Sequence, residues 1–232
     1  MMNKTLKAGV LIAILVVPAS IFLFLKFFGN NRFDLPYYMP KISEQGEVVV
    51  ENGDTVFHQV PSFSLVDQQG KTFTSQTDLK GKFYVVSFFF SRCGTICPVI
   101  TRNQKQIQEA FKGQPDVHLV SISIDPKYDT PNVLEKYAAD LGANPTQWAF
   151  LTGEKTYIYD LAIKGFKLPV ADASAYDPTV TDPDETFIHS EKLLLIDDVG
   201  FIRGIYDGTQ KSEIKRAIVE LKVLQDGKKS SL

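Results

Sequence analysis

Cysteine is scarce in this sequence: its 232 residues contain two, Cys93 and Cys97. Two cysteines are too few for the disulfide scaffold of a small secreted domain, and too few for a zinc site with four cysteine ligands. The chain is long enough to build one domain around a sizeable hydrophobic core without such staples. We therefore expect the two thiols to form a functional site.

An excess of positive charge is also missing. The sequence has 25 Lys and Arg against 27 Asp and Glu, a formal net charge of −2. No basic stripe is available to neutralise phosphates, which argues against nucleic acid as a partner. The sequence also contains no internal repeat and no low-complexity segment, and its 44% hydrophobic content is that of an ordinary globular protein.

One long hydrophobic run, residues 8–25, stands out near the N-terminus. A run of about 18–20 apolar residues suits a bilayer span, and Lys4 and Lys7 before it favour a cytoplasmic N-terminus. A cleaved signal peptide is the alternative, but 17–20 is a poor cleavage site. No cysteine lies near enough for a lipoprotein anchor. We therefore expect an uncleaved transmembrane anchor over residues 8–28.

The sequence predicts five segments. They are a cytoplasmic N-terminus (1–7), the membrane anchor (8–28), a linker (29–47), a folded domain (48–225) and a polar tail (226–232). The linker is predicted from its glycine, prolines and mixed polar residues, which show no periodicity. Because no Arg-rich leader is present, we expect a single-pass protein of a bacterial inner membrane, with its domain on the periplasmic side.

Within the domain, strands are predicted to alternate with helices. Two hairpins come first, one around Asn52-Gly53 and one around the turn at 67–70, and a strongly apolar strand follows at 83–90. The later elements are a helix (99–111), a strand (117–124), a helix (130–142), a strand (148–151), a helix (154–164), an irregular segment (167–185), a hairpin (192–197 and 201–206) and a closing helix (212–224).

This alternation implies parallel strands joined by crossover helices, with antiparallel strands added by the hairpins. The predicted fold class is α/β. It is a thioredoxin-like sandwich, with a central mixed sheet flanked by helices, N-terminal β-hairpins and one preceding transmembrane helix.

The two cysteines directly follow the apolar strand. Pro98 lacks an N–H and is tolerated only in the first turn of a helix, so Cys97 is predicted at about the N-cap and Cys93 in the loop before it. Both sulfurs would then lie near the positive end of the helix dipole, which favours the thiolate. A purely structural disulfide is the alternative, but closing so short a loop gains little stability.

Three motifs resemble the Sco (SenC) family. They are the Cys-x-x-x-Cys of residues 88–98, the Asp-Pro-x-x-Asp-Thr within 121–131, and His189 before an apolar strand. The resemblance covers about residues 58–224. It implies a membrane-anchored, thioredoxin-fold copper chaperone that assists maturation of cytochrome c oxidase. Gly94 stands where many relatives have proline, and Arg92 is unusual before the first cysteine.

The resemblance implies a copper site made by Cys93, Cys97 and His189. Two thiolates select Cu(I), and with an imidazole they also suit Cu(II). Thioredoxins carry a cis-proline in the loop before the corresponding strand, whereas this chain has no proline between Glu185 and Lys192 and places His189 there. The implied partners are the copper-bearing subunit of the oxidase and other copper or thiol-redox proteins. His58 and His118 are expected to be structural.

Two redox functions remain as alternatives. A thiol–disulfide oxidoreductase would cycle the Cys93–Cys97 pair, although the three-residue spacer differs from the usual two. A thiol peroxidase would need a pocket that polarises peroxide, and no motif for one is visible. Copper is preferred because His189 has no necessary role in either enzyme, so the chain is interpreted as a metallochaperone with a redox-active thiol pair.

Three expectations concern residues around this site. Asp129 or Thr130 is expected to cap the helix that Pro131 opens, with a direct role for the nearby aspartates in copper binding as the weaker alternative. Arg92 either lowers the thiol pKa by its charge or points to solvent. The acidic segment up to Glu185 is expected to be a solvated loop, and one hypothesis is that it moves to bring the histidine onto the metal.

Overall fold

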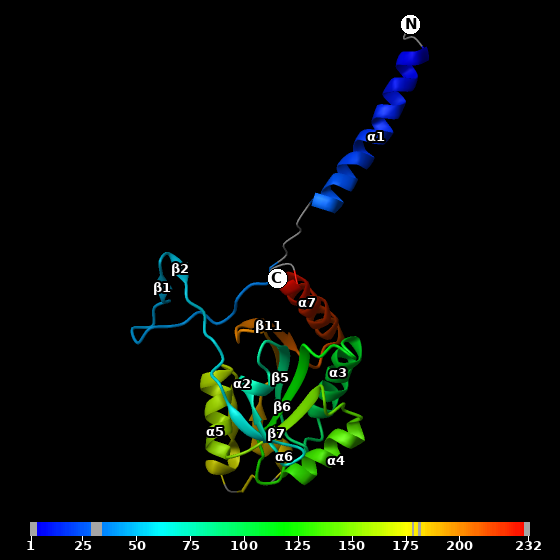
Figure 1. Ribbon diagram of the computed structural model, residues 1–232. Helices are drawn as coiled ribbons and strands as arrows, with labels where there is room; N and C mark the ends of the chain where they lie inside the picture. Colours follow the sequence, from blue (N-terminus) through cyan, green and yellow to red (C-terminus); the bar gives the residue numbers. More distant parts are fainter. Residues whose placement is uncertain (1–3, 29–33, 178, 181, 230–232) are drawn as a thin grey trace. The chain divides into compact units, whose positions relative to one another are not determined.

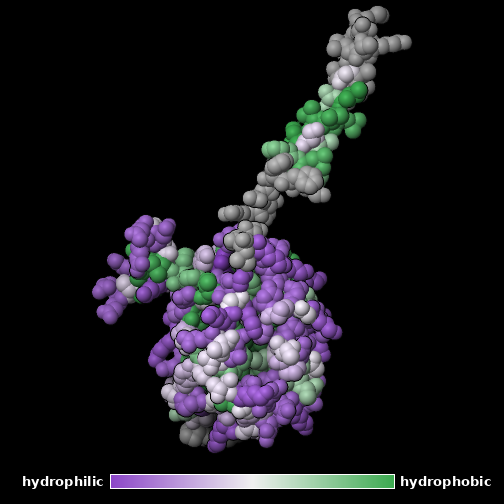
Figure 2. Space-filling view, in the orientation of Figure 1, coloured by the Kyte–Doolittle hydropathy of each residue, from purple (hydrophilic) through white to green (hydrophobic). Residues whose placement is uncertain are grey.

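The computed structural model describes residues 4–28, 34–177, 179–180 and 182–229, and the chain divides into two units, Met1–Phe33 and Asp34–Leu232 (Figure 1). The first unit contains one helix, α1 (Lys4–Phe28). Its described side chains include exposed Leu15 and Phe22, and Figure 2 shows this stretch as hydrophobic. Among the described residues, no helix has the length and apolarity needed to cross a membrane.

A seven-stranded mixed sheet forms the centre of the second unit, in the order β11-β10-β5-β6-β7-β3-β4. The strands are β3 (Ser64–Asp67), β4 (Thr72–Thr74), β5 (Phe83–Phe89), β6 (Val117–Ser123), β7 (Trp148–Thr152), β10 (Lys192–Ile196) and β11 (Ile202–Asp207). β5, β6 and β7 run parallel, and the hairpins on either side pair antiparallel. The predicted mixed sheet is confirmed.

Helices cover both faces of this sheet. They are α2 (Ser75–Asp78), α3 (Cys97–Ala110), α4 (Pro131–Leu141), α5 (Lys155–Asp160) and α7 (Lys211–Lys229). α3 packs against α7, and Figure 1 shows α3 and α4 on one side of the sheet and α5 on the other. α5 continues into a π-helical turn, Leu161–Gly165, in place of the single predicted helix over 154–164.

The core is built around β5, whose seven residues are all buried. Successive side chains of a strand point to opposite faces, so Phe88 and Phe89 pack in opposite directions. Phe88 contacts Phe166, with ring centroids 5.6 Å apart, and Phe89 contacts Tyr137 of α4 at 5.3 Å. A shift of β5 by one residue would exchange these environments, so the packing fixes where the strand ends and the thiol loop begins.

Both predicted N-terminal hairpins are present. β1 (Val50–Glu51) and β2 (Asp54–Thr55) pair around Asn52 and Gly53, which have positive φ angles of 53° and 89°. Such angles are typical of an Asn-Gly hairpin turn. The second hairpin, β3–β4, adds to the edge of the central sheet through β7.

Most of the predicted linker (29–47) belongs to the second unit, which begins at Asp34. The buried guanidinium of Arg203 donates hydrogen bonds to the Asp34 carboxylate and to the carbonyls of Leu35 and Pro36, and it lies 3.9 Å from the centre of the Tyr37 ring. The domain therefore begins at Asp34. Only residues 29–33, outside the described residues, remain between α1 and the domain.

The segment predicted as irregular, 167–185, is partly ordered. β8 (Val170–Asp172) pairs antiparallel with β9 (Phe187–His189), and a 3₁₀ turn (Ala173–Ala175) and α6 (Pro183–Thr186) lie between them. The prediction was wrong for β8 because three residues are too few to show an alternating pattern among prolines and acidic residues.

The closing helix is longer than predicted. α7 continues past Leu224 to Lys229, into the segment predicted as a polar tail. The extension lacks apolar periodicity, but Lys228 donates to the Gly81 carbonyl at 2.7 Å and pairs with Asp198 at 2.7 Å. These contacts from distant parts of the chain hold the last turn, which local sequence does not reveal.

Arg203→Met tests the attachment of 34–38. The change leaves Asp197, which is 4% exposed and lies 3.1 Å from the guanidinium, without its buried cation. Breaking such a pair from one side typically costs about 3–5 kcal/mol, so we expect the free energy of unfolding in urea to fall by about that amount. Asp34→Asn is the matched control, because it removes an exposed partner and should cost less than about 1 kcal/mol. Equal stability of the two variants would contradict this account.

Candidate functional site

The thiol pair lies where β5 passes into α3. Cys93 is in the loop and Cys97 is the first residue of α3, whose N-cap is Ile96. The helix thus begins one residue earlier than predicted, and Pro98 occupies its first turn as expected. Both cysteines are present as thiols.

The thiols are almost excluded from solvent, with Cys93 6% and Cys97 1% exposed. The Cys97 backbone N–H donates to the Cys93 sulfur at 3.4 Å, and the Thr95 hydroxyl lies 3.6 Å from the same sulfur. The Cys93 sulfur therefore lies at a backbone N–H of the helix N-terminus, as predicted. Such an N–H stabilises negative charge on it.

Hydroxyl groups also surround the first turn of α3. The Thr101 hydroxyl donates to the Cys97 carbonyl at 2.9 Å and accepts from the Tyr137 hydroxyl at 3.4 Å. Burial raises the pKa of Tyr137 to about 12, so its hydroxyl remains protonated at neutral pH. This chain of hydrogen bonds links α4 to the helix that carries Cys97.

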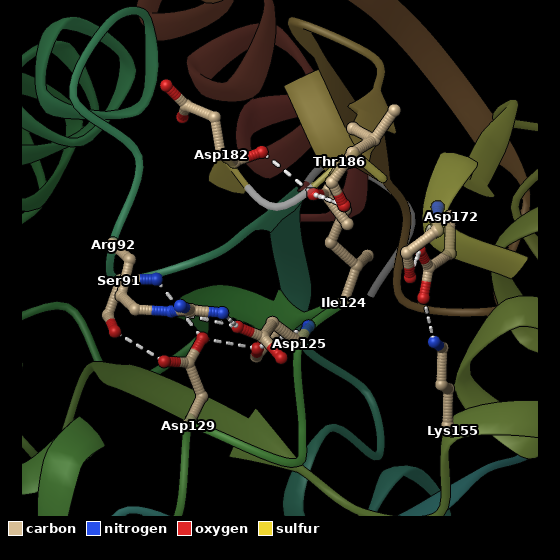
Figure 3. A network of polar contacts seen from close by, with 12 residues as sticks. Ser91, Arg92, Ile124, Asp125, Asp129, Lys155, Asp172, Asp182 and Thr186 are labelled. Carbon is tan, nitrogen blue, oxygen red and sulfur yellow. Dashed lines mark hydrogen bonds and ion pairs between the residues drawn. The ribbon is translucent and has the colours of Figure 1, made fainter. Parts of the chain in front are cut away.

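Asp129 holds the thiol loop to the neighbouring strand. Its carboxylate is 0% exposed and accepts hydrogen bonds from the Ser91 N–H at 3.1 Å, the Ser91 hydroxyl and the Ser123 hydroxyl (Figure 3). Burial raises the pKa of Asp129 above its ordinary value, and the hydrogen bonds from Ser123 and Ser91 act against that rise.

Of the two residues expected to cap α4, Thr130 occupies the N-cap position and Asp129 does not. Thr130 makes no side-chain capping hydrogen bond. Asp129 instead ties together the ends of β5 and β6. With β5 and β6 known to be neighbours, this contact could have been predicted from the positions of Ser91 and Ser123 at the ends of the two strands, because residues that follow adjacent parallel strands meet at one edge of a sheet.

Arg92 does not simply point to solvent, which was one of its two expected placements. Its guanidinium donates through Nε at 3.2 Å and through Nη2 at 2.6 Å to one oxygen of Asp125, and it lies 4.4 Å from the centre of the Tyr128 ring. Asp125 is 5% exposed. The guanidinium therefore pairs with a buried carboxylate in the turn after β6. This contact fixes the position of Arg92, the residue before Cys93.

His189 is the last residue of β9 and pairs with Val170 in the β8–β9 ladder. Two residues earlier, Phe187 packs against Phe90, with ring centroids 5.1 Å apart. Phe90 directly follows β5, so β9 runs beside the strand end that delivers the thiols. The His189 side chain lies outside the described residues, and its role as a ligand stays a prediction. Among the side chains that are described, no three His, Cys, Asp or Glu groups form a metal site.

The other two histidines have structural surroundings, as expected. His58 donates its ring Nε2–H to the Gly165 carbonyl at 2.7 Å. His118, in β6, has its Nε2 3.3 Å from the Lys82 ammonium, and burial together with the Lys82 charge lowers its pKa to about 4.

The sheet order and the position of the thiols define a class: a thioredoxin-like α/β domain with a dithiol at the N-terminus of the helix after the central strand. The SCO1/SenC family model matches residues 52–223. The chain therefore belongs to the SCO1/SenC family.

Individual relatives agree with this membership. The SCO1 protein homolog of Bacillus subtilis is 30% identical over 171 residues, which cover 73% of this chain and 84% of the relative. A structure of BsSco, described as having a disulfide switch and as a member of the Sco family of cytochrome c oxidase assembly proteins, aligns with a TM-score of 0.62 at 29% identity, covering 73% of this chain and 94% of its own. Yeast Sco1 with copper bound aligns with a TM-score of 0.57 at 25% identity, covering 71% and 89%.

Asp129→Ala tests the anchoring of the thiol loop. The change removes the acceptor of the Ser91 N–H and of two hydroxyls in a buried site. Unpaired buried donors typically cost about 1–3 kcal/mol, so urea unfolding should show a loss of about 2–3 kcal/mol. Asp129→Asn keeps one oxygen as an acceptor and should lose much less. If the alanine variant is as stable as the asparagine variant, the three hydrogen bonds do not hold the loop.

Proposed function

We propose that this protein is a copper-binding assembly factor for cytochrome c oxidase, which holds copper through Cys93, Cys97 and His189. The observation that carries the proposal is the buried dithiol at the start of α3, with β9 beside the end of the same central strand. Copper is the cargo of such a protein, received from one partner and passed to another.

The donor set fits copper in its chemistry. Thiolates are soft ligands that favour Cu(I), and the N–H at the Cys93 sulfur helps to stabilise the anionic form that binds metal. The low exposure of both thiols shields a bound ion from water and from oxidation. An imidazole at position 189 would supply the third donor and make the same site suitable for Cu(II).

Two relatives support this assignment through what is known of them. Yeast Sco1 has a copper-bound structure, and BsSco is described as an oxidase assembly protein with a disulfide switch. Both align over more than two thirds of this chain, and the match to the family model spans the thiol loop and β9.

The same two sulfurs would also control release. Oxidation of the Cys93–Cys97 dithiol to a disulfide removes two electrons and two protons and leaves no thiolate to hold a metal ion. Copper would thus be held only by the reduced pair. Delivery of copper and reduction of a partner's disulfide both use this pair, so the two activities belong to one site.

We further propose that α1 anchors the protein in a bacterial inner membrane, with the domain on the periplasmic side. The described part of α1 exposes a run of large apolar side chains, which water does not favour. The surrounding sequence has the length of a bilayer span. An extracytoplasmic space would also allow the thiol pair to cycle through a disulfide.

Copper titration of the reduced full-length protein in detergent tests the ligand set. We expect one copper per chain, lost in Cys93→Ser and in Cys97→Ser and at least tenfold weaker in His189→Ala, because each change removes one donor. His118→Gln is the matched histidine control and should bind like the wild type, since His118 lies within β6. Wild-type affinity in His189→Ala would eliminate the three-ligand site and favour the oxidoreductase alternative.

Cell fractionation tests the anchor. The full-length protein should remain in the inner-membrane fraction after carbonate extraction, and an amine reagent that does not cross membranes should label exposed lysines of the domain, such as Lys136, from the periplasmic side. The paired change Leu15→Lys and Phe22→Lys places two charges in the apolar run and should weaken membrane retention. Recovery of the wild-type protein in the soluble fraction would overturn the proposed anchor.

A further inference from the structure

A cavity of about 400 Å³ lies beside the thiol loop. It opens between the loop residue before Cys93, the turn after β6, the start of α5 and the β8–β9 strands (Figure 3). Its lining includes Arg92, Asp125, Lys127, Lys155, Asp172 and Phe187. The cavity has the size of a small ligand site, and the lining that the structure describes includes none of the three proposed copper ligands.

The two carboxylates of the cavity already have cationic partners. Asp125 accepts two hydrogen bonds from Arg92, and Asp172 accepts from Lys155 and from the Ser174 N–H and hydroxyl at 3.0 and 2.6 Å. Burial alone would raise the pKa of Asp172, but the hydrogen bonds from Lys155 and Ser174 hold it below its usual value. Both carboxylates are therefore paired with a cation and nearly inaccessible.

The cations keep donors that these carboxylates do not use. An arginine has five N–H groups and a lysine three, whereas Asp125 takes two from Arg92 and Asp172 takes one from Lys155. The Arg92 and Lys155 side chains are 36% and 45% exposed. Lys127 is exposed and makes no ion pair with any residue that the structure describes. The cavity thus offers unused donors on three cations, set in a lining that is mostly apolar.

We propose that this cavity binds a carboxylate side chain, aspartate or glutamate, on the protein that exchanges copper or electrons with the thiols. The proposal rests on the proposed function, because it assigns the partner's chemistry next to that site. Arg92 directly precedes Cys93, so an acid bound here would lie one residue away from the loop thiol. The cavity volume and the buried Phe187 ring suit a side chain with its backbone better than a small inorganic anion.

Peptide binding to the full-length protein in detergent micelles tests this cavity. The probe is a capped glycine hexapeptide with two glutamates, and its comparison is the same peptide with two glutamines. In ¹⁵N spectra the glutamate peptide should shift the amide signals of Arg92, Asp125, Lys127, Lys155 and 172–174. The glutamine peptide should bind at least tenfold more weakly, and added salt should weaken the glutamate peptide because the attraction is electrostatic.

Lys127→Glu is the decisive variant, since it reverses an exposed charge outside any described ion pair and leaves the fold undisturbed. It should weaken the glutamate peptide at least fivefold, and Lys155→Gln should weaken it as well. Lys136→Glu, an exposed change of the same charge on α4 and outside the cavity, should stay within twofold of wild type. Equal binding of the two peptides, shifts confined to another surface, or unchanged binding in Lys127→Glu would each overturn the proposal.

Copper titration of Lys127→Glu separates this proposal from the proposed function. We expect Lys127→Glu to bind one copper per chain and to lose peptide binding. That result would support the cavity as a partner site distinct from the metal ligands. If the wild type binds no copper, the proposed function fails while the peptide result still decides the chemistry of the cavity.

Discussion

The burial of β5 on both faces is the constraint on which the site depends. Its side chains alternate between the helices on the two sides of the sheet, so the strand has one register in which every phenylalanine is covered. That register fixes the residue at which the chain leaves the core. The thiol loop, the start of α3 and the contact between Phe90 and Phe187 all follow from that point.

Much of the fold could be predicted from sequence because its signals are local. The Asn-Gly turn, the prolines that open α3 and α4, and the alternation of strands with helices each act over a few residues. The parts of the fold that were predicted wrongly have a different cause. Residues 34–38 are ordered by Arg203, and the last turn of α7 is held by contacts with Gly81 and Asp198, so order there depends on residues far away in the chain.

The same distinction applies to the site. The cysteines and the environment of the Cys93 sulfur could be predicted, because a proline after a buried strand places the helix terminus. The roles of Asp129 and Arg92 could not, since each depends on which strand lies beside β5 in the sheet. A carboxylate after a strand is an ordinary helix cap by local rules, and only the parallel pairing of β5 with β6 turns it into the support of the thiol loop.

The attachment made by Arg203 also determines at which end of the sheet the chain enters the domain. Arg203 pairs with Asp197, the residue after Ile196. Ile196 lies opposite Tyr84, near the start of β5. The thiols, in contrast, follow the end of β5. At about 3.3 Å per residue, the length of β5 separates the attachment point from the thiols by roughly 20 Å. Residues 34–37, which Arg203 contacts, therefore lie toward the start of β5, at the end of the strand opposite the thiol loop. The end of the domain that carries the thiol loop is thus the one that the entering chain does not cover.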